Sequence, residues 1–187
     1  MEEELKKAYE IIRQGGIILY PTDTIWGIGC DAANAEAIGR IYDLKQRPDT
    51  RSMLVLIDSP EYLSHYVREV PEIAFDLIEL SERPLTIIYS GAQNVAPNLI
   101  AQDGSLGIRV TREAFSQQLC RRMKKPLVST SANISEHPAP ANFSEIEEKI
   151  LQGVDYVVNY RRHEKQKNQA SSIIQLREDG TIKIIRE

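Results

Sequence analysis

One feature of the sequence constrains the fold more than any other: short apolar runs alternate with segments of helical periodicity. Residues 17–20 and 53–57 are apolar runs of the kind that forms buried strands. In residues 35–45, apolar side chains instead recur every three or four positions, which is typical of a helix with one buried face. Strands separated by helices predict a sheet with helices on its faces. We therefore expect an α/β fold, a three-layer sandwich with a twisted mixed β-sheet flanked by helices.

Turn and cap signals set the expected bounds of these elements. Gly15 and Gly16 end the first helix, Asn34 caps the second, and Ser144 with Glu147 has the form of a capping box for the last. An Asp179-Gly180 turn joins the two final strands. The expected helices are 2–14, 35–45, 71–80, 115–123 and 144–151. The expected strands are 17–20, 53–57, 86–89, 106–110, 127–130, 156–158, 172–176 and 181–185.

The size and chemistry of the chain exclude several classes of protein. A length of 187 residues suits one domain. The apolar runs are far shorter than the roughly 20 residues that span a membrane, so we expect no membrane partner. The acidic start of the chain is unlike a secretion signal, and Cys30 and Cys120 are too few for a disulfide framework. These features predict a reduced, cytoplasmic protein.

Charge is distributed unevenly along the chain. The net charge is −4, but residues 1–100 hold 9 Lys and Arg against 16 Asp and Glu, whereas residues 101–187 hold 14 against 11. Basic clusters at 121–125 and 161–167 attract phosphates or simply form solvated surface, and for each alone we expect the latter. The polar segment 160–170 is interpreted as a surface loop or, alternatively, as a lid over ligands.

Common catalytic motifs are missing from the sequence. It contains neither a Walker A lysine loop nor a Gly-x-Gly-x-x-Gly fingerprint. His65, His137 and His163 lie in unrelated segments, so we expect surface histidines and no zinc site. Cys30 has no basic neighbour to activate it and is expected to be a core residue.

Three polar stretches follow expected strands or helices, where open α/β sheets bind ligands. Residues 21–29 carry hydroxyl groups and two glycines, although an ordinary turn is the simpler interpretation. Lys45 and Arg47 would converge on one anion if the chain there is extended, and a solvated helix end explains them equally well. Residues 129–135 hold a dense run of hydroxyl and amide groups, which favours a ligand over a cap.

The order of several motifs carries a resemblance to a known family. They are Pro21-Thr22-Asp23-Thr24, Lys45-x-Arg47, Gly107-Ile108-Arg109-Val110, Ser131-x-Asn133, Ser171-Ser172-Ile173-Ile174 and Ile184-Ile185-Arg186. Each alone is weak, but together they resemble the threonylcarbamoyl-AMP synthase (YrdC-like) family of tRNA-modification enzymes over residues 16–186. The resemblance implies one YrdC-like domain over residues 1–187, without the additional C-terminal domain of longer members.

The activity implied by this resemblance is that of an ATP-dependent nucleotidyltransferase. It joins L-threonine, bicarbonate and ATP into threonylcarbamoyl-AMP, releasing pyrophosphate and water, for tRNA threonylcarbamoyladenosine modification. ATP would arrive with Mg²⁺, for which no protein ligand is assigned. Such chemistry needs positioning and charge stabilisation more than a protein nucleophile, which suits the Lys, Arg and hydroxyl groups of these motifs.

The resemblance also assigns roles to individual residues. The catalytic positions are Lys45 and Arg47. The ATP-binding positions are Arg47, Arg51, Ser105, Ser131, Asn133 and Arg186. The threonine-binding positions are Thr24, Arg109, Ser129 and Ser171. Among them, Arg109 suits a carboxylate because its planar guanidinium makes two parallel hydrogen bonds.

Departures from the family pattern leave alternatives open. Ser52, Arg83, Glu136 and Ala139 replace residues that are usual at these positions. A divergent paralogue acting on another amine therefore remains an alternative, as does a protein that binds double-stranded RNA or tRNA, which the basic second half favours and the negative net charge does not. The resemblance itself implies tRNA or double-stranded RNA and a tRNA threonylcarbamoyl transferase complex as partners.

Overall fold

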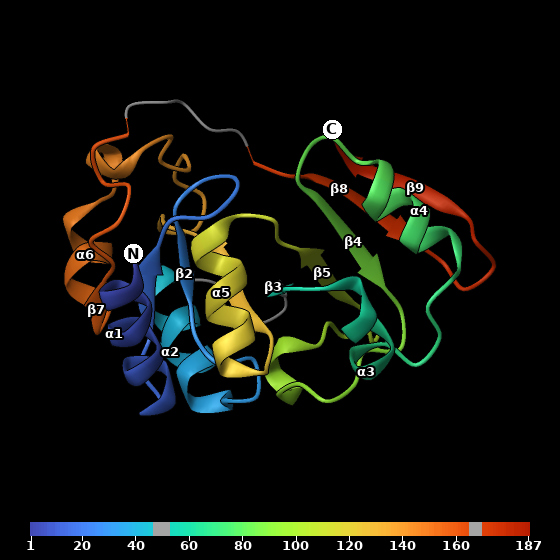
Figure 1. Ribbon diagram of the computed structural model, residues 1–187, viewed down its shortest axis with the longest axis horizontal. Helices are drawn as coiled ribbons and strands as arrows, with labels where there is room; N and C mark the ends of the chain where they lie inside the picture. The colour runs from blue at the N-terminus through green and yellow to red at the C-terminus, as the bar shows by residue number, and fades with distance from the viewer. Residues whose placement is uncertain (47–52, 165–169) are drawn as a thin grey trace.

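The computed structural model describes residues 1–46, 53–164 and 170–187. Its six helices within these residues are α1 (Glu2–Arg13), α2 (Ala35–Lys45), α3 (Leu63–Tyr66), α4 (Ile73–Leu80), α5 (Ala114–Met123) and α6 (Glu148–Gly153). The strands are β1 (Ile18–Tyr20), β2 (Gly27–Gly29), β3 (Leu54–Ile57), β4 (Leu85–Tyr89), β5 (Leu106–Val110), β6 (Leu127–Ser131), β7 (Tyr156–Val157), β8 (Ser172–Leu176) and β9 (Ile182–Arg186). The α/β expectation is confirmed (Figure 1).

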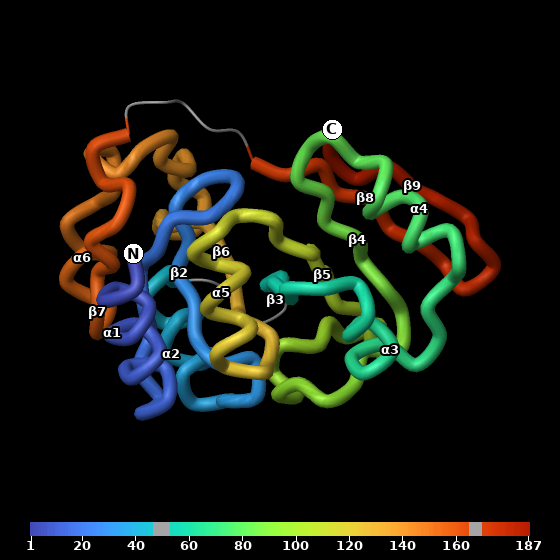
Figure 2. Tube along the Cα trace, viewed as in Figure 1, coloured from blue at the N-terminus to red at the C-terminus, as the bar shows by residue number. Residues whose placement is uncertain are grey.

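The nine strands described form one mixed sheet in the order β7-β1-β2-β6-β3-β5-β4-β8-β9. The pairs β1–β7, β3–β5 and β4–β8 are parallel, and the other neighbours are antiparallel. Figure 2 shows the consequence for the chain path: it passes from β7 at one end of the sheet to β8 near the other. Residues distant in sequence therefore meet in the middle of the sheet.

Helices cover the two faces of the sheet and enclose two separate cores. On one face, α1 and α5 pack with Ile18, Tyr20 and Leu56. On the other, α2 and α6 share a larger core with residues such as Ile17, Leu19 and Val55. Successive strand residues alternate between the cores because side chains alternate across a strand. This arrangement confirms the three-layer sandwich.

Two details of the expected secondary structure are wrong. Strand β2 was not expected, because its two glycines hide the strand pattern. Gly29 is nevertheless required there, since a Cβ atom would lie 2.3 Å from the Val128 carbonyl oxygen. The proposed capping box is also wrong: Oγ of Ser144 donates to Oδ1 of Asn142, in a 3-10 turn, and α6 starts only at Glu148.

Three simpler expectations, for the last turn, the cysteines and the histidines, are confirmed. The Asp179-Gly180 turn joins β8 and β9, with Gly180 at φ +82°. Both cysteines are buried and unbonded, and burial raises the pKa of each thiol, which argues against a nucleophile. All three histidines are exposed. No helix in the described part of the chain is long and apolar enough to cross a membrane.

Candidate active site

The main candidate site is a cavity of about 270 Å³ on the sheet face that carries α1 and α5. Its floor is formed by residues of neighbouring strands that share this face by register, among them Leu54, Thr86, Gly107 and Ser129. Residues two positions further along β3 and β6, Leu56 and Leu127, belong instead to the core packed with α1 and α5. The cavity therefore lies where the helices stop covering the sheet.

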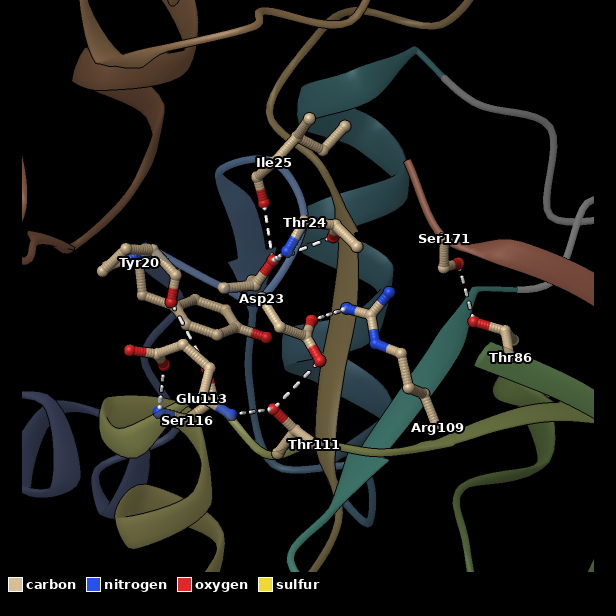
Figure 3. A network of polar contacts seen from close by, with 12 residues as sticks. Tyr20, Asp23, Thr24, Ile25, Thr86, Arg109, Thr111, Glu113, Ser116 and Ser171 are labelled. Carbon is tan, nitrogen blue, oxygen red and sulfur yellow. Dashed lines mark hydrogen bonds and ion pairs between the residues drawn. The ribbon is translucent and has the colours of Figure 1, made fainter. Parts of the chain in front are cut away.

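A nearly buried arginine forms the charged wall of this cavity. Arg109 on β5 is 3% exposed, and its Nη2 lies 3.1 Å from Oδ1 of Asp23, an ion pair without hydrogen-bond alignment. Its Nε is buried and has no hydrogen-bond partner among the residues that the structure describes. Figure 3 shows the guanidinium between Asp23 on one side and Ser171 with Thr86 on the other. Because a buried donor without an acceptor is costly, this geometry favours an anionic ligand.

Asp23 connects Arg109 to the start of α5. Oγ1 of Thr111 donates to Oδ2 of Asp23 at 3.4 Å, and the backbone N–H of Glu113 donates to Thr111 Oγ1 at 3.3 Å. The Glu113 carboxylate caps α5 by accepting from the N–H of Ser116 at 2.8 Å (Figure 3). Arg109 is thus oriented by a polar network anchored to a helix end.

The turn between β1 and β2 presents Thr24 to the cavity. Oγ1 of Thr22 accepts from the Thr24 N–H at 3.0 Å, lies 3.0 Å from Thr24 Oγ1, and donates to the Ile25 carbonyl at 2.8 Å. Both threonines are at least 95% buried. The turn is built by its own hydroxyl groups, and Ile25 and Trp26 continue along the cavity wall.

The opposite wall comes from the C-terminal strands. Thr86 Oγ1 and Ser171 Oγ lie 2.9 Å apart, both buried. Arg186 on β9 donates to the Ser171 carbonyl through Nε and Nη2, at 2.9 and 2.7 Å. Burial, and next the charge of Arg109, lower the pKa of Arg186 from its usual value. Two arginines thus face one cavity, and their combined positive charge strengthens its preference for anions.

Ser105 lies at the edge of the cavity and is held by an aspartate. Its N–H and Oγ both donate to Oδ1 of Asp103, at 3.0 and 2.6 Å. These two bonds lower the pKa of Asp103. Ser105 is fixed by a turn rather than by its strand neighbours.

Most of the residues predicted for the site are gathered around this cavity. Those that line it are Thr24, Ser105, Arg109, Ser129, Ser131, Ser171 and Arg186. Lys45 and Asn133 are not among its lining residues. Arg47 and Arg51 lie outside the described residues, as does the departure at Ser52.

Lys45 and Asn133 instead organise the loop after β6. Lys45 is 1% exposed, and its Nζ donates to the carbonyls of Ser131 and Asn133, at 2.5 and 2.6 Å. The Asn133 side chain donates to the carbonyls of Ile134 and His137, while its buried Oδ1 has no hydrogen-bond partner in the described part of the chain. The Ser-x-Asn motif is therefore fastened to the end of α2 by an ammonium group.

Sequence reasoning missed two functional positions. Asp23 stood within a recognised motif but received no role, and its pairing with Arg109 depends on a contact between distant segments. Thr86 carried no signal beyond a hydroxyl in an apolar strand. Among the departures, Glu136 has φ +72°, which explains why glycine suits that position. Ala139 and Arg83 are exposed.

The fold and this cavity define an α/β protein with a cavity on an uncovered part of its sheet, whose two arginines suit a small anionic ligand. The model of the Sua5/YciO/YrdC family, described as telomere recombination, matches residues 10–187. The chain belongs to this family. A threonylcarbamoyl-AMP synthase of Vibrio parahaemolyticus is 32% identical over 151 residues, covering 79% of this chain and 82% of the relative.

Solved structures agree with the assignment. E. coli YciO is 26% identical with a TM-score of 0.86, covering all of this chain and 90% of YciO. P. abyssi Sua5, solved in complex with L-threonine, is 24% identical with a TM-score of 0.82, covering 94% of this chain and 52% of Sua5. This second likeness concerns the fold alone, and the chain spans about half the length of that Sua5.

Proposed function

We propose that the protein is an L-threonylcarbamoyladenylate synthase, which makes threonylcarbamoyl-AMP and pyrophosphate from L-threonine, bicarbonate and ATP for tRNA modification. Support comes from family membership and from relatives of this name at about 30% identity over most of the chain. The single observation that carries the proposal is Arg109, a 3% exposed guanidinium on the cavity wall. Its buried Nε has no hydrogen-bond partner within residues 1–46, 53–164 and 170–187. A carboxylate supplies the acceptors that this group lacks.

Threonine occupies the part of the cavity between the β1–β2 turn and β8. Its carboxylate pairs with Arg109, opposite the Asp23 contact, and the hydroxyls of Thr24, Ser129 and Ser171 surround it. The apolar residues Met53, Leu54 and Ile173 also line the cavity and suit a methyl group. A buried site that hydrogen-bonds a substrate hydroxyl rejects analogues that lack it, because its polar groups then stay unpaired.

ATP lies beside threonine along β6 and the end of β9. Ser105, Ser131 and Arg186 contact the nucleotide, and Asn133 shapes the loop through its bonds to Ile134 and His137. Lys45 holds the backbone of that loop and supplies positive charge close to it. Arg47 and Arg51 lie outside the described residues, and the family resemblance assigns them to the triphosphate.

The site promotes the reaction by holding the substrates in position. The threonine amine first reacts with bicarbonate to give a carbamate and water. A carbamate oxygen then attacks the α-phosphorus of ATP, and pyrophosphate leaves. Lys45 and Arg47 stabilise the charge that develops, and the cations of the site oppose the repulsion between carbamate and triphosphate. No protein group forms a covalent bond, in keeping with the buried cysteines and exposed histidines.

Mg²⁺ accompanies ATP, but the described residues hold no group of three or more His, Cys, Asp or Glu side chains that would bind a metal. We therefore assign it no protein ligand and no step of the reaction.

We further propose one domain over residues 1–187, acting in the cytoplasm, whose product passes to tRNA through a threonylcarbamoyl transferase complex. Weak, salt-sensitive tRNA binding would accompany this role.

Pyrophosphate release by the purified protein tests the function. Release from ATP and Mg²⁺ is expected to require both L-threonine and bicarbonate. Valine and serine serve as matched controls for the hydroxyl and the methyl. Release indifferent to threonine, or stronger with another amine, would instead indicate the divergent paralogue.

A further inference from the structure

Arg161, the first residue of the basic cluster at 161–167, contacts residues behind the site without lining the cavity. Arg161 has φ +60°, an uncommon conformation for a residue with a side chain. Such strain persists where surrounding contacts hold it. Its side chain is 23% exposed. The contacts of the Arg161 side chain therefore show what holds this backbone conformation in place.

Those contacts join three segments of the chain. Nη1 of Arg161 donates to the Thr22 carbonyl at 3.2 Å and lies 3.4 Å from Oε1 of Glu113, which is 9% exposed. Nε of Arg161 donates to Glu164 at 2.8 Å, and Nη2 lies 2.8 Å from the same carboxylate. Glu164 thus orients the guanidinium from the outside, while Thr22 and Glu113 receive it on the inside.

Both inner partners belong to the machinery of the site. Thr22 builds the turn that presents Thr24, through the bonds of its Oγ1. Glu113 starts the network that runs through Thr111 to Asp23 and so to Arg109. One guanidinium therefore links the two supports of the proposed threonine site.

We propose that Arg161 is a positioning residue for threonine binding: it ties the Thr22 turn to the Glu113 cap, and so sets the relative placement of Thr24 and Arg109. This inference rests on the proposed function for its substrate. Arg161 touches neither reacting groups nor the cavity, and acts through Thr22 and Glu113.

The test compares Arg161→Met, Arg161→Lys and a control, Arg40→Gln. Arg40 makes an ion pair with Asp155 of 2.9 Å, away from the cavity. Arg161→Met is expected to raise the threonine KM by about 5- to 30-fold, less than the full loss of a charge-assisted hydrogen bond because Arg161 acts through Thr22 and Glu113. The ATP KM should stay within about twofold. Arg161→Lys keeps the charge but reaches only one partner, so it should recover part of the loss. Arg40→Gln should change neither KM.

Hydrogen exchange separates this inference from the proposed function. The Thr24 amide should exchange faster in Arg161→Met than in the wild type or in Arg40→Gln, whatever the substrate is. If the wild type shows no threonine-dependent turnover, the proposed function fails while faster exchange still supports the positioning role. Unchanged Thr24 exchange, or equal rises in both KM values, would overturn the inference.

Discussion

Two regions of the same sheet face have opposite characters. Under α1 and α5 the face is apolar and closed, with Leu56 and Leu127 fully buried. Two residues along the same strands, Leu54 and Ser129 line the cavity, beside Arg109 and Thr86. The strands continue without interruption, and only the helical cover ends. The candidate site arises here because polar residues replace apolar ones where the layer formed by α1 and α5 stops.

Truncating the covered half should produce the largest change in stability. Leu119 on α5 is fully buried, and Leu119→Ala should lower the free energy of unfolding by about 2–5 kcal/mol. The threonine KM of the folded fraction should stay within about twofold of the wild type. Urea unfolding and steady-state kinetics at low temperature measure both. A large KM change would show that the two regions are coupled.

Changing the charged wall should have the opposite effect, with a large change in the threonine KM and a small change in stability. Arg109→Lys keeps a charge near Asp23 but loses the planar fork, so the threonine KM should rise by about 10- to 150-fold, as expected for about 1.5–3 kcal/mol of charge-assisted hydrogen bonding. The ATP KM should change much less. Kinetics with each substrate varied in turn measure this. Equal increases in both KM values would contradict the assignment of Arg109 to threonine.

The hydroxyl pair on the opposite wall should show coupling of smaller size. Thr86→Val and Ser171→Ala each remove one member of a buried pair 2.9 Å apart. The double variant should lose less stability than the sum of the singles, with a coupling of about 0.5–1.5 kcal/mol. Thermal unfolding of all four proteins provides the cycle. Simple additivity would mean that the two hydroxyls do not interact.

The smallest expected change lies outside both regions. Glu136 is exposed and has φ +72°, so Glu136→Gly should relieve strain and raise the free energy of unfolding by about 0.5–1 kcal/mol. Both KM values should remain unchanged. Glu136→Ala, which keeps the strain, is the matched control, and chemical unfolding distinguishes the two.

Much of the fold could be predicted from local patterns. The helices at residues 35–45 and 115–123 follow their apolar spacing, and the strands at 106–110 and 172–176 follow their apolar runs. Strand β2 could not be found in this way, because Gly27 and Gly29 carry no side-chain signal and are selected by close contacts with β6 and Tyr20. The start of α6 depended on whether Ser144 donates or accepts a hydrogen bond.

The sequence by itself determined the class of fold, the motifs and most of the residues around the cavity, because periodicity and motif order are properties of the chain. Only the tertiary structure decided which residues each of these side chains contacts. Arg109 meets Asp23 although the two lie 86 positions apart in the sequence, and Lys45 turns to carbonyls of the loop after β6 rather than to the cavity. Such contacts depend on strand order and on where a helix stops covering the sheet, which no local pattern encodes.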